Sequence, residues 1–299
     1  MRSSLLWVDQ IKDREGNQLC IYDLAFSPEG DQLIIAADIR VYVYNANDGT
    51  LIQALKGHKD NVLCVAYSMD GKRFASGSAD KQVIIWTSKM EGILKYSHND
   101  AIRCIQYNPL SHQLVSCTAS DFGLWSPEQK AVTKQKINSQ INSCSWSSDG
   151  HYLALALTSG HISIRNRNGE EKNRIERMGG PLAPIWGVSF CPLKDEDSDA
   201  IVSVDWTQSM SFYDLNGKAI AKERNIGFDP LCVSYFWSGD YILVSGSNKK
   251  ALLYTREGIF IGCVAEQTSW IWCAKSSPDG NRITSWIWCA KSSPDGNRI

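Results

Sequence analysis

Apolar and polar positions alternate along this chain in short runs that are typical of β-strands. The clearest set occupies residues 62–68, 74–78, 83–86 and 92–97, four runs separated by short polar segments. Asp70-Gly71, between the first two runs, is a dipeptide that favours a two-residue hairpin turn. Helical periodicity is absent throughout, so the pattern predicts an all-β protein.

This four-strand unit recurs about every 40 to 45 residues along the chain. Similar first strands are expected to begin near residues 21, 62, 102, 141, 185, 230 and 271. A four-stranded unit of this length is typical of a propeller blade. We therefore predict one seven-bladed β-propeller over residues 1–283, its last blade incomplete.

The end of the chain contains an undiverged repeat. Residues 268–283 read TSWIWCAKSSPDGNRI, and residues 284–299 repeat the same letters. A perfect tandem copy is typical of a truncation, a recent duplication or an artefact of gene prediction, and this one is too short to be a blade. We expect the third strand of the last blade to be missing or improvised from 284–299, and residues 4–10 to supply a closing strand.

The second unit carries the residues that identify the repeat type. From Gly57 to Trp86 the chain reads GHKDNVLCVAYSMDGKRFASGSADKQVIIW, which resembles the WD-repeat consensus. In that family a His, a strand Ser, a turn Asp and a Trp form a buried hydrogen-bonded network within the blade. The resemblance implies such a network here, drawn from His58, Ser76 or Ser78, Asp80 and Trp86.

Other units depart from this consensus. Arg165 takes the Trp position in the fourth unit, and the turn of the third unit at Ser120-Asp121 is shortened, although His98 recurs there. We expect such blades to rely on apolar packing more than on the polar network.

Composition limits the kinds of partner. The 31 basic and 32 acidic side chains nearly cancel, so no overall positive charge favours a nucleic acid or an anionic membrane. No apolar run is long enough to cross a bilayer, and no secretory signal is visible. The chain is expected to be intracellular and soluble, and its partners are expected to be proteins.

Cysteines outside the repeated segment show no metal-binding spacing. They are Cys20, Cys64, Cys104, Cys117, Cys144, Cys191, Cys232 and Cys263. None forms a C-x-x-C pair, and no histidine cluster lies near them. We expect small buried side chains in a reducing compartment, with no metal and no cofactor.

Catalytic motifs are also missing from the sequence, which contains no nucleophile elbow, phosphate-binding glycine loop or zinc-protease motif. A propeller hydrolase with a metal in the central channel would need convergent acidic or histidine ligands. The corresponding turn residues are mixed and include no histidine: Asp38, Asp80, Ser120, Ser159, Asp205 and Asn248. The chain is therefore not expected to be an enzyme.

Binding through loops is the remaining function class. Linkers between blades and turns between second and third strands are expected to share one face of the disc. The candidates there are Lys59, Asp60, Asn99, Asp100, Asp205 and Trp206. A tryptophan in a turn is a natural interface anchor, so Trp206 is the hot-spot candidate, and packing over the adjacent blade is its alternative role.

A closer resemblance concerns residues 55–102, 120–132, 162–172, 184–190 and 266–272. The irregular segment SDFGLWSPEQKAV, residues 120–132, is the most specific of these. They resemble the amino-terminal propeller of the intraflagellar transport protein 122 family, subunits of intraflagellar transport complex A. The resemblance covers essentially residues 1–283.

This resemblance implies a non-enzymatic scaffold acting in retrograde ciliary transport, cilium assembly and the import of membrane cargo into the cilium. It implies other complex A subunits and cargo adaptors as partners, with no nucleic acid, direct membrane insertion or small-molecule substrate. The implied location is the cilium, at the axoneme and base, together with the cytoplasm. The alternative is a generic intracellular WD-repeat adaptor, such as a ubiquitin-ligase substrate receptor.

Overall fold

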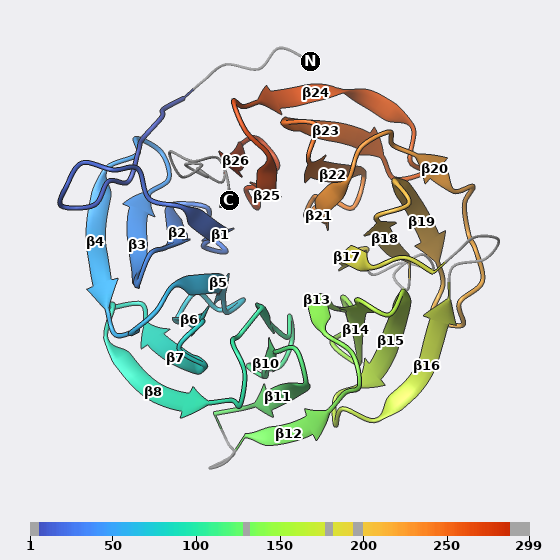
Figure 1. The fold of residues 1–299 in the computed structure, drawn as a ribbon, viewed down its shortest axis with the longest axis horizontal. Coiled ribbons are helices and arrows are strands. Elements are labelled where there is room, and N and C mark those ends of the chain that lie inside the picture. The colour runs from blue at the N-terminus through green and yellow to red at the C-terminus, as the bar shows by residue number, and fades with distance from the viewer. Residues whose placement is uncertain (1–5, 128–131, 177–181, 194–199, 288–299) are drawn as a thin grey trace, which may run out of the picture.

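The computed structural model describes residues 6–127, 132–176, 182–193 and 200–287. They form a ring of antiparallel β-sheets around a central opening, and each sheet adds its strands in succession from the opening to the rim (Figure 1). We number the sheets as blades 1 to 7 in chain order. Within these ranges no helix has the length and hydropathy needed to cross a membrane.

The first three blades are four-stranded. Blade 1 contains β1 (Ile21–Phe26), β2 (Gln32–Ala37), β3 (Arg40–Asn45) and β4 (Leu51–Lys56). Blade 2 contains β5 (Val62–Tyr67), β6 (Arg73–Ser78), β7 (Gln82–Thr87) and β8 (Gly92–Ser97). Blade 3 contains β9 (Cys104–Tyr107), β10 (Leu114–Cys117), β11 (Asp121–Trp125) and β12 (Thr133–Lys136).

The next three blades follow the same order. Blade 4 contains β13 (Ile141–Trp146), β14 (Tyr152–Leu157), β15 (His161–Asn166) and β16 (Glu171–Glu176). Blade 5 contains β17 (Ile185–Phe190), β18 (Ile201–Asp205), β19 (Ser209–Tyr213) and β20 (Arg224–Asn225). Blade 6 contains β21 (Pro230–Tyr235), β22 (Tyr241–Gly246), β23 (Lys250–Thr255) and β24 (Phe260–Glu266).

The seventh position holds only a two-stranded sheet, β25 (Ile271–Ser276) and β26 (Ile283–Ile287). The described residues therefore form six complete blades instead of seven. The tandem copy contributes residues 284–287 to the second strand of this sheet, where we had expected it to replace a third strand. The remaining residues of the copy, 288–299, lie outside the described ranges.

Apolar packing joins each blade to its neighbours. Between blades 1 and 2, for example, Val41 and Leu55 pack in one cluster with Val62, Phe74 and Trp86. The middle strands are apolar on both faces because both faces are covered by adjacent blades, as the burial of β7 illustrates. The outermost strands, such as β8, are largely exposed. The core is thus divided into clusters, each located between two blades.

The interface between blades 7 and 1 is different, because the buried part of its cluster contains only Cys273 from blade 7. Polar contacts supplement it. The Arg282 guanidinium donates to the Asn47 side-chain oxygen at 2.8 Å and to the Gly30 carbonyl at 2.6 Å. It also lies 5.9 Å from the centre of the Phe26 ring. Arg282 thus joins the turn of blade 7 to blade 1 through polar contacts.

The amino-terminal segment packs on blade 1 without forming the expected strand. Residues 6–10 of the predicted closing strand have no strand structure, and residues 4 and 5 lie outside the described ranges. Trp7 stacks on Tyr44, with 6.2 Å between the ring centres, and its indole N–H donates to the Ala46 carbonyl at 3.2 Å. Ile11 is buried in the cluster between blades 7 and 1. The segment thus adds apolar side chains to the interface that blade 7 fills poorly.

The contacts of Arg282 predict that Arg282→Ala destabilises the ring. Removing a charged donor from two hydrogen bonds should lower the free energy of unfolding by about 1–3 kcal/mol. Urea denaturation measures the change. Lys89→Ala, in an exposed turn of blade 2, is the control and should shift it by less than about 0.5 kcal/mol. Equal stability of the two variants would contradict the role assigned to Arg282.

Candidate functional site

Blade 2 contains a continuous polar network beneath its surface. His58 comes from the linker between β4 and β5, and Asp80 from the turn between β6 and β7. The His58 Nδ1 lies 3.1 Å from an Asp80 carboxylate oxygen, and its Nε2 lies 2.8 Å from the Ser76 hydroxyl. The Trp86 indole N–H donates to the same hydroxyl at 2.9 Å. All groups are satisfied when Ser76 donates to Nε2 and the Nδ1–H of His58 donates to Asp80.

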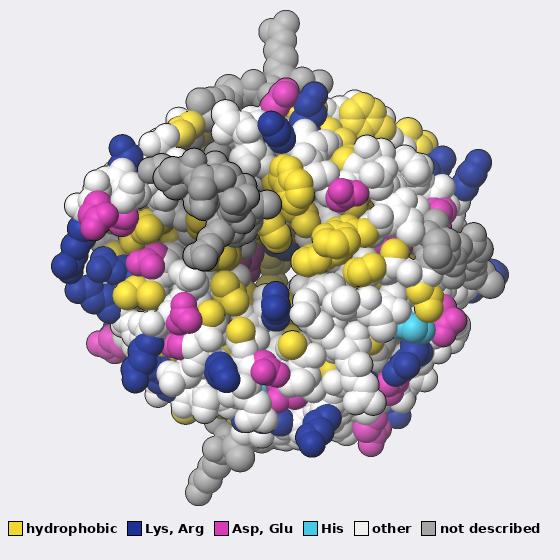
Figure 2. Space-filling view, viewed as in Figure 1, with side chains coloured by type: hydrophobic (Ala, Val, Ile, Leu, Met, Phe, Trp, Pro, Cys, Tyr) yellow, Lys and Arg dark blue, Asp and Glu magenta, His cyan; other side chains and the backbone are white. Residues whose placement is uncertain are grey.

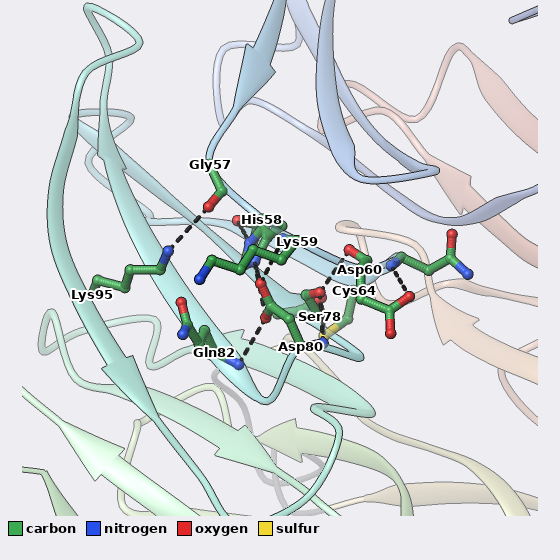
Figure 3. A network of polar contacts seen from close by, with 12 residues as sticks. Gly57, His58, Lys59, Asp60, Cys64, Ser78, Asp80, Gln82 and Lys95 are labelled. Carbon is green, nitrogen blue, oxygen red and sulfur yellow. Dashed lines mark hydrogen bonds and ion pairs between the residues drawn. The ribbon is translucent and has the colours of Figure 1, made fainter. Parts of the chain in front are cut away.

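Ser78, the other serine candidate, has a separate role. Its hydroxyl donates to the Asp60 carbonyl at 2.9 Å and accepts the Asp80 backbone N–H at 3.0 Å. The Asp80 carboxylate also accepts the backbone N–H groups of Lys59 at 2.9 Å and Gln82 at 3.0 Å (Figure 3). Ser76 therefore links the histidine to the tryptophan, whereas Ser78 fixes the turn against the linker.

Burial keeps this histidine neutral. Loss of solvent lowers the pKa of His58 and outweighs the opposing effect of the Asp80 carboxylate. The pKa of Asp80 is also lowered: burial opposes the shift, but the backbone N–H of Lys59 and the His58 ring overcome it. A neutral imidazole whose two nitrogens are both hydrogen-bonded is a structural group, with no nitrogen free for proton transfer.

Blade 3 repeats the network, although we expected such blades to rely on apolar packing more than on polar contacts of this kind. The His98 Nδ1 lies 2.6 Å from an Asp121 carboxylate oxygen, and its Nε2 lies 2.8 Å from the Ser116 hydroxyl. The network forms despite the shortened turn, because the Thr118 hydroxyl donates a hydrogen bond to the Asp121 carboxylate at 2.9 Å. Burial lowers the pKa of His98 as it does that of His58. The recurrence of His98 was the sequence signal for this second network.

Arg165 takes over the tryptophan's position in blade 4. Its Nε donates to the Ser163 hydroxyl at 2.8 Å, and its guanidinium pairs with Glu171 at 2.6 Å. The guanidinium carbon also lies 5.6 Å from the centre of the Phe122 ring of blade 3. A charged side chain thus fills an apolar position because a carboxylate, a hydroxyl and a ring satisfy it.

The candidate interaction residues lie on one face, which we call the loop face. It carries the linkers between blades and the turns between second and third strands. In an antiparallel blade the start of the first strand lies beside the end of the second, so both kinds of loop lie on the same face. Lys59, Asp60 and Asn99 are exposed there, and Asp100 is half-buried. Asp205 is buried, and its carboxylate accepts the Thr207 backbone N–H at 2.7 Å, so it shapes its turn and offers little surface.

Trp206 packs within its own blade and not over the adjacent one, which we had considered as its alternative role. Its side chain is 47% exposed and stacks on Trp186 of β17, with 4.8 Å between ring centres and 23° between ring planes. Neither Trp186 nor Trp270 was among the predicted residues, and Trp270 is 46% exposed in the linker before β25. Hydrophobic side chains gather beside the central opening over β17, β18 and β25 (Figure 2). A pre-stacked, half-exposed indole is suited to anchoring a partner.

The cysteines are less scattered than the sequence predicts. Among the described residues, the sulfur atoms of Cys104, Cys117 and Cys144 all lie within 4.8 Å of one another. Sequence spacing conceals this group because its members come from three strands of two blades. It is the one set of residues in the described part of the chain whose geometry suits a metal ion.

The matching family model and the similar proteins indicate the same family. A family model described as the IFT122 first beta-propeller matches residues 20–299. The chain is 59% identical over 283 residues to intraflagellar transport protein 122 homolog of Xenopus tropicalis, covering 95% of this chain and 24% of that protein. The corresponding mouse protein is 58% identical, with 95% of this chain and 23% of that protein covered. The chain thus spans about a quarter of the length of these relatives.

Solved structures support the fold alone. A structure of U3-55K has a TM-score of 0.78 and 17% identity, covering 91% of this chain and 90% of that one. The RRP9 WD40 repeats have the same TM-score and identity, covering 91% and 88%.

The two buried histidines predict a loss of stability in mild acid. Both pKa values are lowered in the folded state, so the unfolded chain binds protons first, near pH 6.5. Their stabilising effect is complete above that pH and is lost as pH falls, by up to about 1.4 kcal/mol per pH unit for each histidine.

Urea denaturation between pH 7.5 and 5.5 measures this loss. His58→Gln and His98→Gln should each flatten the pH dependence, whereas the control His151→Gln, at an exposed position, should leave it unchanged. An unchanged slope in both network variants would show that these histidines are not the titrating groups.

Proposed function

The chain belongs to the intraflagellar transport protein 122 family, and from that premise we propose that it is a non-enzymatic protein-interaction scaffold of intraflagellar transport complex A. The observation that carries the proposal is the family match over residues 20–299, together with 59% identity to the Xenopus tropicalis relative. The matched region covers 95% of this chain and so includes loops as well as strands. It therefore supports a shared binding role as well as a shared fold.

The structure is compatible with a scaffold. Each of the six complete blades contributes a turn between its second and third strands to the loop face, beside the linkers between blades, so one ring presents several separate surfaces. His58 and His98, the histidines that open blades, are buried and fully hydrogen-bonded. Trp206 and Trp270 provide exposed aromatic surface on the same face. These features favour binding over catalysis.

We also propose a cellular role for the chain within this family. Other complex A subunits and cargo adaptors are the partners, and the ring helps retrograde transport, cilium assembly and the import of membrane cargo into the cilium. The chain would act at the ciliary base and axoneme and pass through the cytoplasm. Family membership supports a role in intraflagellar transport, since the relatives are named for it, and the finer roles are part of the proposal.

Trp206 offers a direct test of this function. Trp206→Ala should reduce co-precipitation of complex A subunits with the tagged chain, because truncating a central aromatic anchor costs about 2 kcal/mol or more, roughly a thirtyfold loss of affinity. Quantitative immunoblotting of the recovered subunits provides the measurement.

Trp237→Ala is the matched control. Trp237 is 42% exposed in the turn between β21 and β22, at the opposite ends of the strands, so its loss should leave recovery unchanged. Unchanged recovery with Trp206→Ala would exclude Trp206 as an anchor. Recovery of ubiquitin-ligase subunits with no transport subunits would instead favour a generic adaptor.

A further inference from the structure

Three cysteine side chains converge between blades 3 and 4. Cys104 and Cys117 face each other directly in the antiparallel pair β9 and β10. Cys144 approaches them from β13, the inner strand of blade 4. All three sulfur atoms lie within 4.8 Å of one another. Cys104 and Cys117 are 13 residues apart in the sequence, and Cys117 and Cys144 are 27 residues apart. The arrangement of the blades in the ring brings the three residues together.

The surroundings of the three thiols are apolar. Cys117 is fully buried, whereas Cys104 and Cys144 are half-buried. All three pack on a cluster that includes Phe122 and Trp146. Cys104 and Cys144 belong to the inner strands of their blades, β9 and β13.

We propose that Cys104, Cys117 and Cys144 form a three-sulfur site for Cu(I). Thiolates are soft ligands that select Cu(I) and Zn(II). A metal–sulfur bond of about 2.3 Å places two sulfurs of a planar three-coordinate ion about 4.0 Å apart. The sulfurs, all within 4.8 Å of one another, need to move by less than about 1 Å to reach that geometry.

The number of ligands distinguishes between the two ions. Zn(II) takes four ligands in structural sites, whereas the group found in the described residues offers three donor atoms. Cu(I) binds readily to three ligands, and the three donor atoms therefore assign the site to Cu(I). Each thiol that coordinates the ion releases its proton to solvent, and no oxidation step is involved. The bound ion would join two strands of blade 3 to the inner strand of blade 4.

Competition with a chelator tests the site in the whole chain. The reduced protein is titrated anaerobically with Cu(I) in the presence of bicinchoninate, whose coloured copper complex reports the free ion. We expect one Cu(I) to be withdrawn per chain. Cys144→Ser should weaken binding at least tenfold, and the control Cys263→Ser, at an exposed thiol on β24, should not change it.

Mapping of the thiols in the unmodified chain keeps the proposal testable if Cys144→Ser does not fold. Iodoacetamide labelling followed by peptide mass spectrometry should show Cu(I)-dependent protection of Cys104, Cys117 and Cys144, with Cys263 labelled equally in both states. Protection of Cys232 and Cys273 in their place would overturn the proposal. Equal Cu(I) binding by folded Cys144→Ser and the parent chain, or retention of Zn(II) in preference to Cu(I), would also overturn it.

Discussion

Each blade of this ring packs only against its two neighbours, so the ring holds together only if the last blade closes onto the first. Asp23 lies at this junction: its carboxylate accepts the Val65 backbone N–H at 3.0 Å from blade 2 and lies 3.3 Å from the Cys273 sulfur of blade 7. Arg282 adds the second set of contacts to blade 1. Apolar clusters join the other blades, whereas this closing interface combines a thin apolar layer with half-buried polar groups.

The sequence predicted the repeated parts of the ring because each blade repeats one local pattern. Strands begin at Ile21, Val62 and Ile141 where the period places them, and the hairpin at Asp70-Gly71 follows from turn chemistry. The closing interface is not part of the repeated pattern, so its contacts could not be predicted from that pattern. The amino-terminal segment was misassigned as a strand because its apolar residues pack on Tyr44 and do not pair with a neighbouring backbone.

The candidate site likewise contains contacts that the repeat predicts and contacts that it does not. The network around His58 was accessible to sequence because a consensus describes it, and His98 marked the second network. The Trp186 and Trp206 stack and the three-thiol group join residues with no local relation in the sequence. The thiol group forms because the ring places strands of blades 3 and 4 side by side, and the indole stack forms because β17 and the turn after β18 lie together in blade 5. Sequence patterns do not report such contacts, because the residues that make them are far apart along the chain.

Amide hydrogen exchange across residues 271–287 tests ring closure most directly. If β25 and β26 pair as described and close onto blade 1, the backbone amides of both strands are protected to the same order as those of β1. Mass spectrometry of peptides from these segments measures the protection. Exchange of residues 271–287 at the rate of an unstructured peptide, with β1 to β24 still protected, would show that the ring is open and would contradict the account.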